Sequence, residues 1–373
     1  MTRPLHIKHY PPFLSCCSSL PTRAPGWWRG GKLFESVFGL PYLWAVAAGA
    51  SAILLYTAVG GFLAVSWTDV LQWLLMAVVL VAVPVMAFGS AGGLGSGLAR
   101  IEAVDPNLFE LFTKADGTAL GLVGILSLAA WGFGYFGQPH ILARFQAIGS
   151  VADVGRARVI AVSWVTIALI GAVLAGLAGV LVLDTPLAAD DREKVFIELV
   201  NLLFHPVIAG ICLAAILAAI MTTADSQLLV SSSAFTEDLY RTLLRPEAGP
   251  RELVAVGCGS VVILAGLAFV MALDPETMVL DLVGYAWAGF GAAFGPVVIL
   301  SLYWPRMTRR GALAGIVTSG ITVVVWKQLE GGLFDVYELL PGFLLSLTAV
   351  WIASLSDHAP RAGLVAGFRQ ALR

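Results

Sequence analysis

The sequence predicts an all-α protein that crosses a membrane many times, and three observations predict it. Of the 373 residues, 58 % are hydrophobic and only 12 % are charged, and the mean hydropathy is +0.87. A soluble globular domain carries about 25 % charged and about 45–50 % apolar residues. Long uncharged stretches alternate with short polar segments, without the residue-by-residue alternation of an outer-membrane barrel. The net charge of −2 at pH 7 argues against a nucleic-acid-binding protein.

Nine stretches are predicted to be transmembrane helices. A membrane span needs about 20 residues with few or no charges. Seven stretches meet this length and two are shorter. In chain order the nine are 41–63, 70–92, 119–139, 159–183, 199–224, 253–273, 282–304, 311–326 and 339–356. We expect a short turn at Ala64–Asp69 between the first two spans.

The distribution of Lys and Arg predicts the orientation, because basic residues concentrate in cytoplasmic loops. Twelve basic residues follow the third, fifth and seventh spans or lie in the C-terminal tail, and only five lie in the intervening loops. We therefore expect the C-terminus in the cytoplasm and residue 40 outside.

A dense group of side-chain oxygens lies at the end of the fifth predicted span. Thr222, Thr223, Asp225 and Gln227 occur within six residues, and the run Ser231–Ser233 follows. Oxygen ligands suit a hard cation such as sodium. The alternative is that each hydroxyl bonds back to a carbonyl of its own helix.

The end of the third predicted span, Trp131 to His140, combines aromatic residues with three alternating glycines and a proline. These residues weaken a helix, and a broken membrane helix is tolerated where it lines a cavity. Trp131 and Tyr135 are four residues apart and are predicted to share one helical face, where they can enclose a small substrate. The alternative is an interfacial aromatic belt.

Other polar and small residues favour structural roles when taken alone. Ser66 or Thr68 is predicted to cap the next helix, which would place Asp69 in its first turn. Gly291 and Gly295 have the spacing of a helix-packing pair. No paired carboxylates, nucleophile–base pair or phosphate-binding loop indicates an enzyme.

Four segments carry a resemblance to a known family. They are GGFLAVSWTD (60–69), WGFGYFGQPHILARF (131–145), LAAIMTTADSQLLVSSSAFTEDLYR (217–241) and YAWAGFGAAFGP (285–296). Together they resemble the solute:sodium symporter family, in order from about Gly30 to the C-terminus, and within it the sodium/proline symporters. The resemblance implies part of a leucine-transporter-type core of two inverted repeats, with the site at the membrane midplane. It also implies L-proline uptake into a bacterial cell across the inner membrane, driven by sodium, with no obligate protein partner.

The resemblance also assigns roles to matching residues. The Ala219 carbonyl and the Thr222 and Thr223 hydroxyls match sodium ligands, and Asp69 matches an aspartate linked to sodium dependence. The role of Asp225 stays open, because the family varies at this position. The positions tied to proline binding are matched by Trp131, Tyr135 and Pro139.

The N-terminal segment does not fit the family pattern. Members begin with about four further helices, and residues 1–29 are rich in Pro, Ser and Cys without a 20-residue apolar run. We expect residues 1–29 to be a non-native or frameshifted segment and residues 30–373 to be a symporter domain that lacks its first helices. A symporter for another amino acid or a small carboxylate, a membrane sensor and an inactive gene product remain alternatives.

Overall fold

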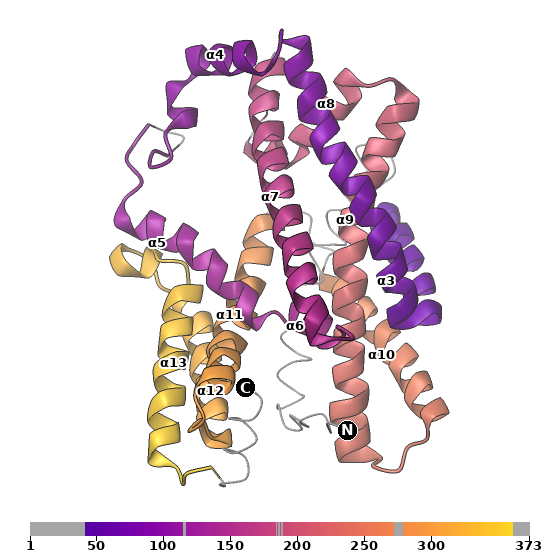
Figure 1. Ribbon diagram of the computed structural model, residues 1–373, viewed down its shortest axis with the longest axis vertical. Coiled ribbons are helices and arrows are strands. Elements are labelled where there is room, and N and C mark those ends of the chain that lie inside the picture. Colours follow the sequence, from indigo (N-terminus) through magenta and orange to yellow (C-terminus); the bar gives the residue numbers. More distant parts are fainter. Residues whose placement is uncertain are drawn as a thin grey trace. The chain divides into compact units, whose positions relative to one another are not determined.

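The computed structural model describes residues 42–360 with gaps at 115–116, 184, 186, 188 and 272–278. This part of the chain is built mainly of helices joined by short connections (Figure 1). Tertiary contacts divide it into two compact units. The expected boundary at residue 30 lies outside the described residues.

The first unit comprises the described parts of Met1–Gly117 and Ile148–Val279. Most of its mass is in four long helices, and a π-helical segment continues the third of them. Its elements are α3 (Tyr42–Ser90), α4 (Leu94–Val104), η1 (Pro106–Phe109), α7 (Val151–Val182), η3 (Ala189–Lys194), α8 (Val195–Leu203), α9 (Pro206–Ser233), the π-helix η4 (Ala234–Leu244) and α10 (Pro250–Met271).

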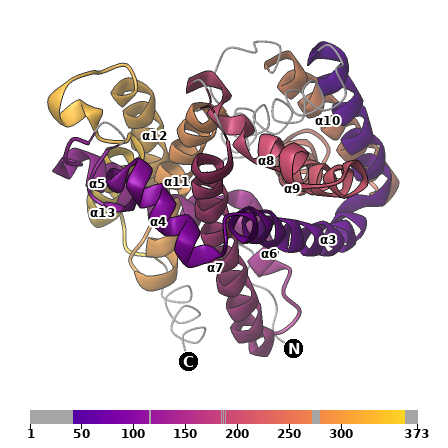
Figure 2. The ribbon, with the colours of Figure 1, turned by 90° about the horizontal axis from the view of Figure 1, so that it is seen from above.

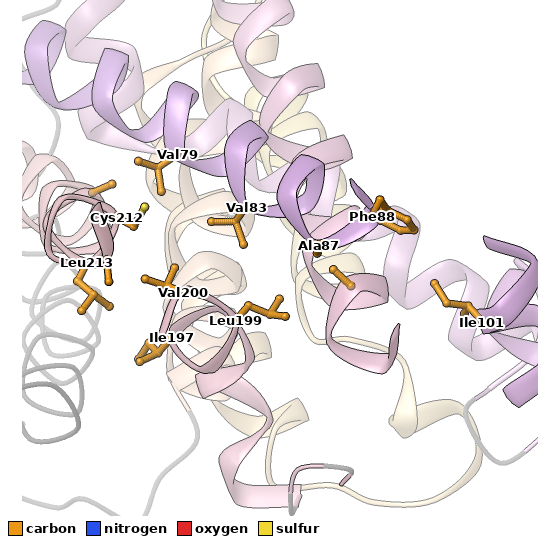
Figure 3. Packing of buried hydrophobic residues seen from close by; sticks show 13 residues of the cluster. Val79, Val83, Ala87, Phe88, Ile101, Ile197, Leu199, Val200, Cys212 and Leu213 are labelled. Carbon is orange, nitrogen blue, oxygen red and sulfur yellow. The ribbon is translucent and has the colours of Figure 1, made fainter. Parts of the chain in front are cut away.

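The main hydrophobic cluster of this unit joins α3, α8 and α9, with single contributions from α4 and α7. Figure 3 shows Val79 and Val83 of α3 facing Val200 of α8 and Cys212 of α9. Val83 and Val200 are fully buried. Because lipid is as apolar as these side chains, close packing holds such a cluster inside a membrane more than exclusion from water does.

The second unit comprises the described parts of Thr118–Ala147 and Leu280–Arg373. The short helix α5 lies beside the connection between α12 and α13 in both views (Figures 1 and 2). The elements of the unit are α5 (Leu122–Ala130), the 3₁₀ segment η2 (Trp131–Gly137), α6 (Pro139–Gln146), α11 (Val279–Tyr303), α12 (Arg309–Trp326), η5 (Gly332–Asp335) and α13 (Leu339–Ser356).

Small residues allow α12 and α13 to pack closely. A Cβ atom at Gly311 would lie 2.9 Å from the Val350 carbonyl oxygen, and one at Gly315 would lie 3.0 Å from Ser346 Oγ. Thr308 caps α12 by accepting a 3.1 Å hydrogen bond from the Gly311 N–H. The two glycines therefore bring the helix axes to a distance that a larger side chain would prevent.

Six helices of the described chain are long and apolar enough to cross a membrane. They are Val65–Ser90, Val151–Val182, Pro206–Leu244, Pro250–Val270, Val283–Tyr303 and Leu339–Ser356. The all-helical membrane class is thereby confirmed. Of the other predicted spans, 119–139 contains the short apolar helical stretch Leu122–Gly137, 311–326 falls on the 18-residue α12, and 41–63 falls on the first part of α3.

The turn predicted at Ala64–Asp69 is wrong, because these residues are helical. The break lies earlier, at Gly61, where φ is 58° and only glycine is free of strain. The predicted Thr68 cap is wrong for the same reason. Thr68 Oγ1 donates to the Val65 carbonyl inside the helix over 2.9 Å.

Candidate functional site

The segment that carries the three predicted substrate residues changes its helix type. α5 ends at Ala130, and the chain continues as the 3₁₀ segment η2 through Gly137. Gln138 is extended, and Pro139 opens α6 at a position where its missing N–H costs no helical bond. The helix interruption predicted from the glycines and proline is therefore present.

Two of the glycines bring η2 into backbone contact with α11. A Cβ atom at Gly137 would lie 2.8 Å from the Gly295 nitrogen and 2.9 Å from Gly291 Cα. A Cβ atom at Gly291 would lie 2.6 Å from Gly134 Cα. The packing role predicted for Gly291 and Gly295 is confirmed: Gly291 packs against η2, and Gly295 packs against both η2 and Phe343 of α13.

Trp131 and Tyr135 are brought together by a third aromatic residue, Trp287 of α11. The Trp131 and Trp287 rings stack at 5.6 Å with an interplanar angle of 14°. Tyr135 meets Trp287 edge-on at 4.9 Å and 84°. The shared helical face predicted for the pair is wrong, because residues four apart in a 3₁₀ helix differ by about 120° in direction.

Hydrogen bonds fix this aromatic group in place. Trp287 Nε1 donates to the Trp131 carbonyl over 3.0 Å. Gln138, which is 1 % exposed, donates from Nε2 to the Trp287 carbonyl over 3.3 Å. Trp287 and Gln138 carry no local signal that marks them as members of this group, although both lie inside segments that carry the family resemblance. Tyr135 remains 46 % exposed, so part of its ring is available to a ligand.

The predicted sodium ligands lie on one turn of α9. Thr222 Oγ1 donates to the Ala219 carbonyl over 3.0 Å, and Thr223 Oγ1 donates to the same oxygen over 3.1 Å. The alternative of hydroxyls bonded to their own helix therefore holds here. It does not exclude a cation, because each hydroxyl keeps lone pairs and can rotate its proton away from the Ala219 carbonyl, which makes that oxygen available.

Asp225 and Asp69 are both buried side chains in the first unit. Asp225 is 0 % exposed and accepts a 3.3 Å hydrogen bond from Ser226 Oγ, and Asp69 is 8 % exposed on α3. Ser226 Oγ also lies 2.7 Å from the Thr222 carbonyl, so its single proton is shared between two acceptors. A buried carboxylate is costly unless polar or charged groups compensate it, so both positions are of functional interest.

The serine run that follows the oxygen group has a structural role at Ser232. Its Oγ donates to the Gly257 carbonyl of α10 over 2.8 Å and accepts from Ser260 Oγ over 2.8 Å. Ser232 is thus used to attach α9 to α10.

The two sets of candidate residues belong to different units. Trp131, Tyr135 and Pro139 lie in the second unit, whereas Ala219, Thr222 and Thr223 lie in the first. The side chains of each set are arranged by contacts within their own unit.

A sequence model of the sodium:solute symporter family matches residues 24–319. Among similar proteins, the sodium/proline symporter of Escherichia coli (strain K12) is 48 % identical over 353 residues, which cover 93 % of this chain and 69 % of that protein. The high-affinity proline transporter PutP of Bacillus subtilis (strain 168) is 47 % identical over 336 residues, or 89 % of this chain and 69 % of that protein.

A solved structure also matches the fold. It is a sodium-coupled sialic acid symporter in a substrate-bound, outward-open state, with a TM-score of 0.76 and 18 % sequence identity. The match covers 93 % of this chain and 74 % of that chain. The chain therefore shares the leucine-transporter-type fold of that symporter, as the family resemblance implied.

Proposed function

The chain belongs to the sodium:solute symporter family, and we propose that it carries L-proline into the cell together with sodium. The observation that carries the proposal is near-half identity, over about nine tenths of the chain, to proteins described as proline transporters or sodium/proline symporters. Transport, rather than catalysis, is the activity that this membership supports.

We assign the sodium-binding role to Ala219, Thr222 and Thr223. The three oxygens gather within hydrogen-bond distance on one turn of α9, which supports the assignment. A dehydrated sodium ion needs more than three oxygens, so further ligands complete the shell. The buried carboxylates of Asp69 and Asp225 are candidates for these further ligands, because they supply charge as well as oxygen.

We assign the proline-binding role to Trp131, Tyr135 and Pro139. The rigid ring of Trp287 holds the first two, and this supports the assignment because a preorganised aromatic wall binds at little entropic cost. Proline is a small apolar ring with an ammonium and a carboxylate group. An aromatic wall suits the ring, and the polar 3₁₀ backbone of η2 suits the charged groups.

We place the protein in the bacterial inner membrane with its C-terminus in the cytoplasm. The excess of twelve over five basic residues in alternate loops supports this orientation. An alkaline phosphatase fusion after Arg373 should be inactive and a fluorescent-protein fusion there should be bright. The reverse pattern would overturn the orientation.

The proposed function is tested with the purified chain. Radiolabelled L-proline binding in detergent and uptake into vesicles are measured with and without an inward sodium gradient. We expect sodium, and not potassium, to raise both. Sodium-driven uptake of another amino acid or of a small carboxylate instead of proline would correct the substrate, and the absence of any sodium-dependent solute binding would overturn the proposal.

A further inference from the structure

Three arginines are gathered at the end of the second unit where α11 is connected to α12. The three side chains, all of them exposed, are those of Arg306, Arg309 and Arg310. The connection is attached to the end of α13, because the Arg306 guanidinium donates to the Leu355 carbonyl over 3.3 Å and the Thr308 N–H donates to Ser354 Oγ over 3.2 Å. The three arginines, called the arginine surface below, are therefore carried by a backbone that is fixed in place.

The arginine surface carries more positive charge than its surroundings balance. Among the described residues, Asp357 is the only acidic side chain that contacts it, and its carboxylate lies 3.3 Å from the Arg310 guanidinium. His358 lies 3.8 Å from the same carboxylate and can only add positive charge. Arg306 bonds to a neutral carbonyl, and Arg309 forms no hydrogen bond or ion pair with any described residue. Within this part of the chain, two positive charges are therefore left for a partner.

The arginine surface lies at the height of the lipid headgroups. The membrane-spanning helices next to it end at Tyr303 in α11 and at Ser356 in α13. Arg306 follows the first of these ends by three residues and is hydrogen-bonded to Leu355 at the second. The headgroup layer adds roughly 5–8 Å to each side of the hydrocarbon core, so residues within a turn or two of these ends lie inside it. The guanidinium groups are therefore within reach of lipid phosphates.

The helices that lead to the arginine surface present apolar side chains on the membrane side of it. Trp351 and Leu355 of α13 are both exposed and lie four residues apart, and therefore on one side of the helix. Tyr303 at the end of α11 is also exposed, and a tyrosine at this height is typical of a membrane interface. Positive charge at headgroup height, next to an exposed apolar helix face, fits an anionic amphiphile. A soluble anion would use only the arginines.

We propose that the arginine surface binds an anionic phospholipid, with Arg306 and Arg309 on the headgroup phosphate and the acyl chains along Trp351 and Leu355. A guanidinium group matches a phosphate because its planar fork donates two parallel hydrogen bonds. A zwitterionic phospholipid also has a phosphate, but its cationic group would be repelled by the unbalanced arginines. None of the residues assigned to sodium or proline takes part, so this site is independent of the proposed function.

The test uses the purified full chain in phosphatidylcholine vesicles, in a potassium buffer without sodium or proline. Part of the lipid is replaced by phosphatidylglycerol with brominated acyl chains, which quench nearby tryptophan fluorescence, and brominated phosphatidylcholine is the reference. We expect phosphatidylglycerol to bind about twentyfold more tightly than phosphatidylcholine, because two unbalanced arginines contribute about fivefold each. Trp351→Phe should reduce the additional quenching, since this ring lies beside the proposed acyl chains.

Arg309→Gln is the sharpest variant, because Arg309 bonds to no described residue and its loss should leave the fold unchanged. It should weaken phosphatidylglycerol binding about fivefold, and adding Arg306→Gln should bring the affinity close to that for phosphatidylcholine. The matched control is Arg241→Gln in η4. It removes the same charge, but from an arginine that Glu237 already balances at 2.9 Å, so it should keep the lipid preference of the parent.

The outcomes bear on the lipid site alone and leave symport untouched. Equal quenching by the two brominated lipids overturns the site, and so does a lipid preference that survives the loss of both Arg306 and Arg309. An equal loss of preference in Arg241→Gln would show that only net charge matters, which also overturns it. If inorganic phosphate at constant ionic strength displaces the phosphatidylglycerol, the arginines bind soluble anions and the lipid assignment is wrong.

Discussion

The segment η2 and the helix α9 both carry candidate ligands, but they hold them by different means. In η2 the aromatic groups are fixed by contacts with α11, more than 140 residues away in the sequence. In α9 the Thr222 and Thr223 hydroxyls are fixed by bonds to the Ala219 carbonyl three and four residues before them. The first geometry depends on tertiary packing, and the second is almost wholly local.

This difference predicts how substitutions affect each region. Substitutions that separate η2 from α11 should damage folding and substrate binding together. Substitutions of the α9 hydroxyls should damage ion binding while the helix stays intact, since its backbone bonds do not need them.

The largest effect is expected from Gly137→Val. A Cβ atom here meets backbone atoms of Phe290, Gly291 and Gly295, which cannot move aside as a flexible side chain can. We expect destabilisation at or above the upper end of the roughly 1–3 kcal/mol typical of overpacking. Thermal unfolding in detergent, monitored by tryptophan fluorescence, should show a markedly lower midpoint or no folded protein.

Two glycine controls lie where added Cβ atoms meet open space. Gly132→Ala in η2 should cost little, and Gly210→Ala in α9 should be neutral or stabilising by up to about 1 kcal/mol, because alanine favours a helix more than glycine does. If Gly137→Val unfolds at the same temperature as Gly132→Ala, the close approach of η2 to α11 is not what holds this unit.

The sequence predicted the helices and their interruption better than it predicted the contacts between distant segments. Hydropathy and glycine spacing were enough for the long helices and for the break near Trp131, because both depend on neighbouring residues. The partner Trp287 was not predictable, since nothing in its local sequence indicates which of several apolar helices it contacts. The interval between the predicted spans 41–63 and 70–92 suggests a turn at Ala64–Asp69, but the helix continues there and the Thr68 hydroxyl bonds to its own backbone.

The site residues show the same division. The gathering of Ala219, Thr222 and Thr223 follows from their spacing on one helical turn. The ion pair between Lys327 and Glu338 could not be predicted from the sequence. The two residues lie eleven positions apart, at the ends of the connection between α12 and α13, and only the fold brings their charged groups to 3.9 Å.

The second prediction concerns the α9 hydroxyls. Replacing both Thr222 and Thr223 by Ala should abolish sodium stimulation of proline binding, because it removes two of the three assigned oxygens. Stability should change by less than about 1 kcal/mol, since both hydroxyls bond to the Ala219 carbonyl of their own helix. Sodium titration of proline binding and thermal unfolding measure the two effects separately.

The double variant with Ser at both positions is the matched test, because it keeps the oxygens and removes only the methyl groups. It should retain sodium stimulation. Full sodium stimulation in the double Ala variant would instead leave the two hydroxyls as purely structural groups.

The third prediction concerns Tyr135. Tyr135→Ala should weaken proline binding by about tenfold or more, because an aromatic wall that is buried by the ligand contributes roughly 1.5–3 kcal/mol. The midpoint of unfolding should fall only slightly, since the ring is 46 % exposed and loses one edge contact with Trp287. Phe136→Ala is the control, as its ring is similarly exposed, at 48 %. Equal binding by the two variants would return Tyr135 to the aromatic-belt interpretation.

The smallest effect is expected from Ser232→Ala, which tests a tertiary contact made by a side chain of α9. This hydroxyl, unlike those of Thr222 and Thr223, bonds across to the Gly257 carbonyl of α10. Ser260 Oγ also lies 2.8 Å from that carbonyl and can satisfy it alone, so the cost should be only about 0.5–1.5 kcal/mol. Sodium stimulation should be unchanged, because the contact joins two helices and supplies no ligand. Ser232→Ala combined with Ser260→Ala should cost less than the sum of the single changes, since each single change already removes the hydrogen bond between the two hydroxyls, and strict additivity would mean that this bond contributes nothing.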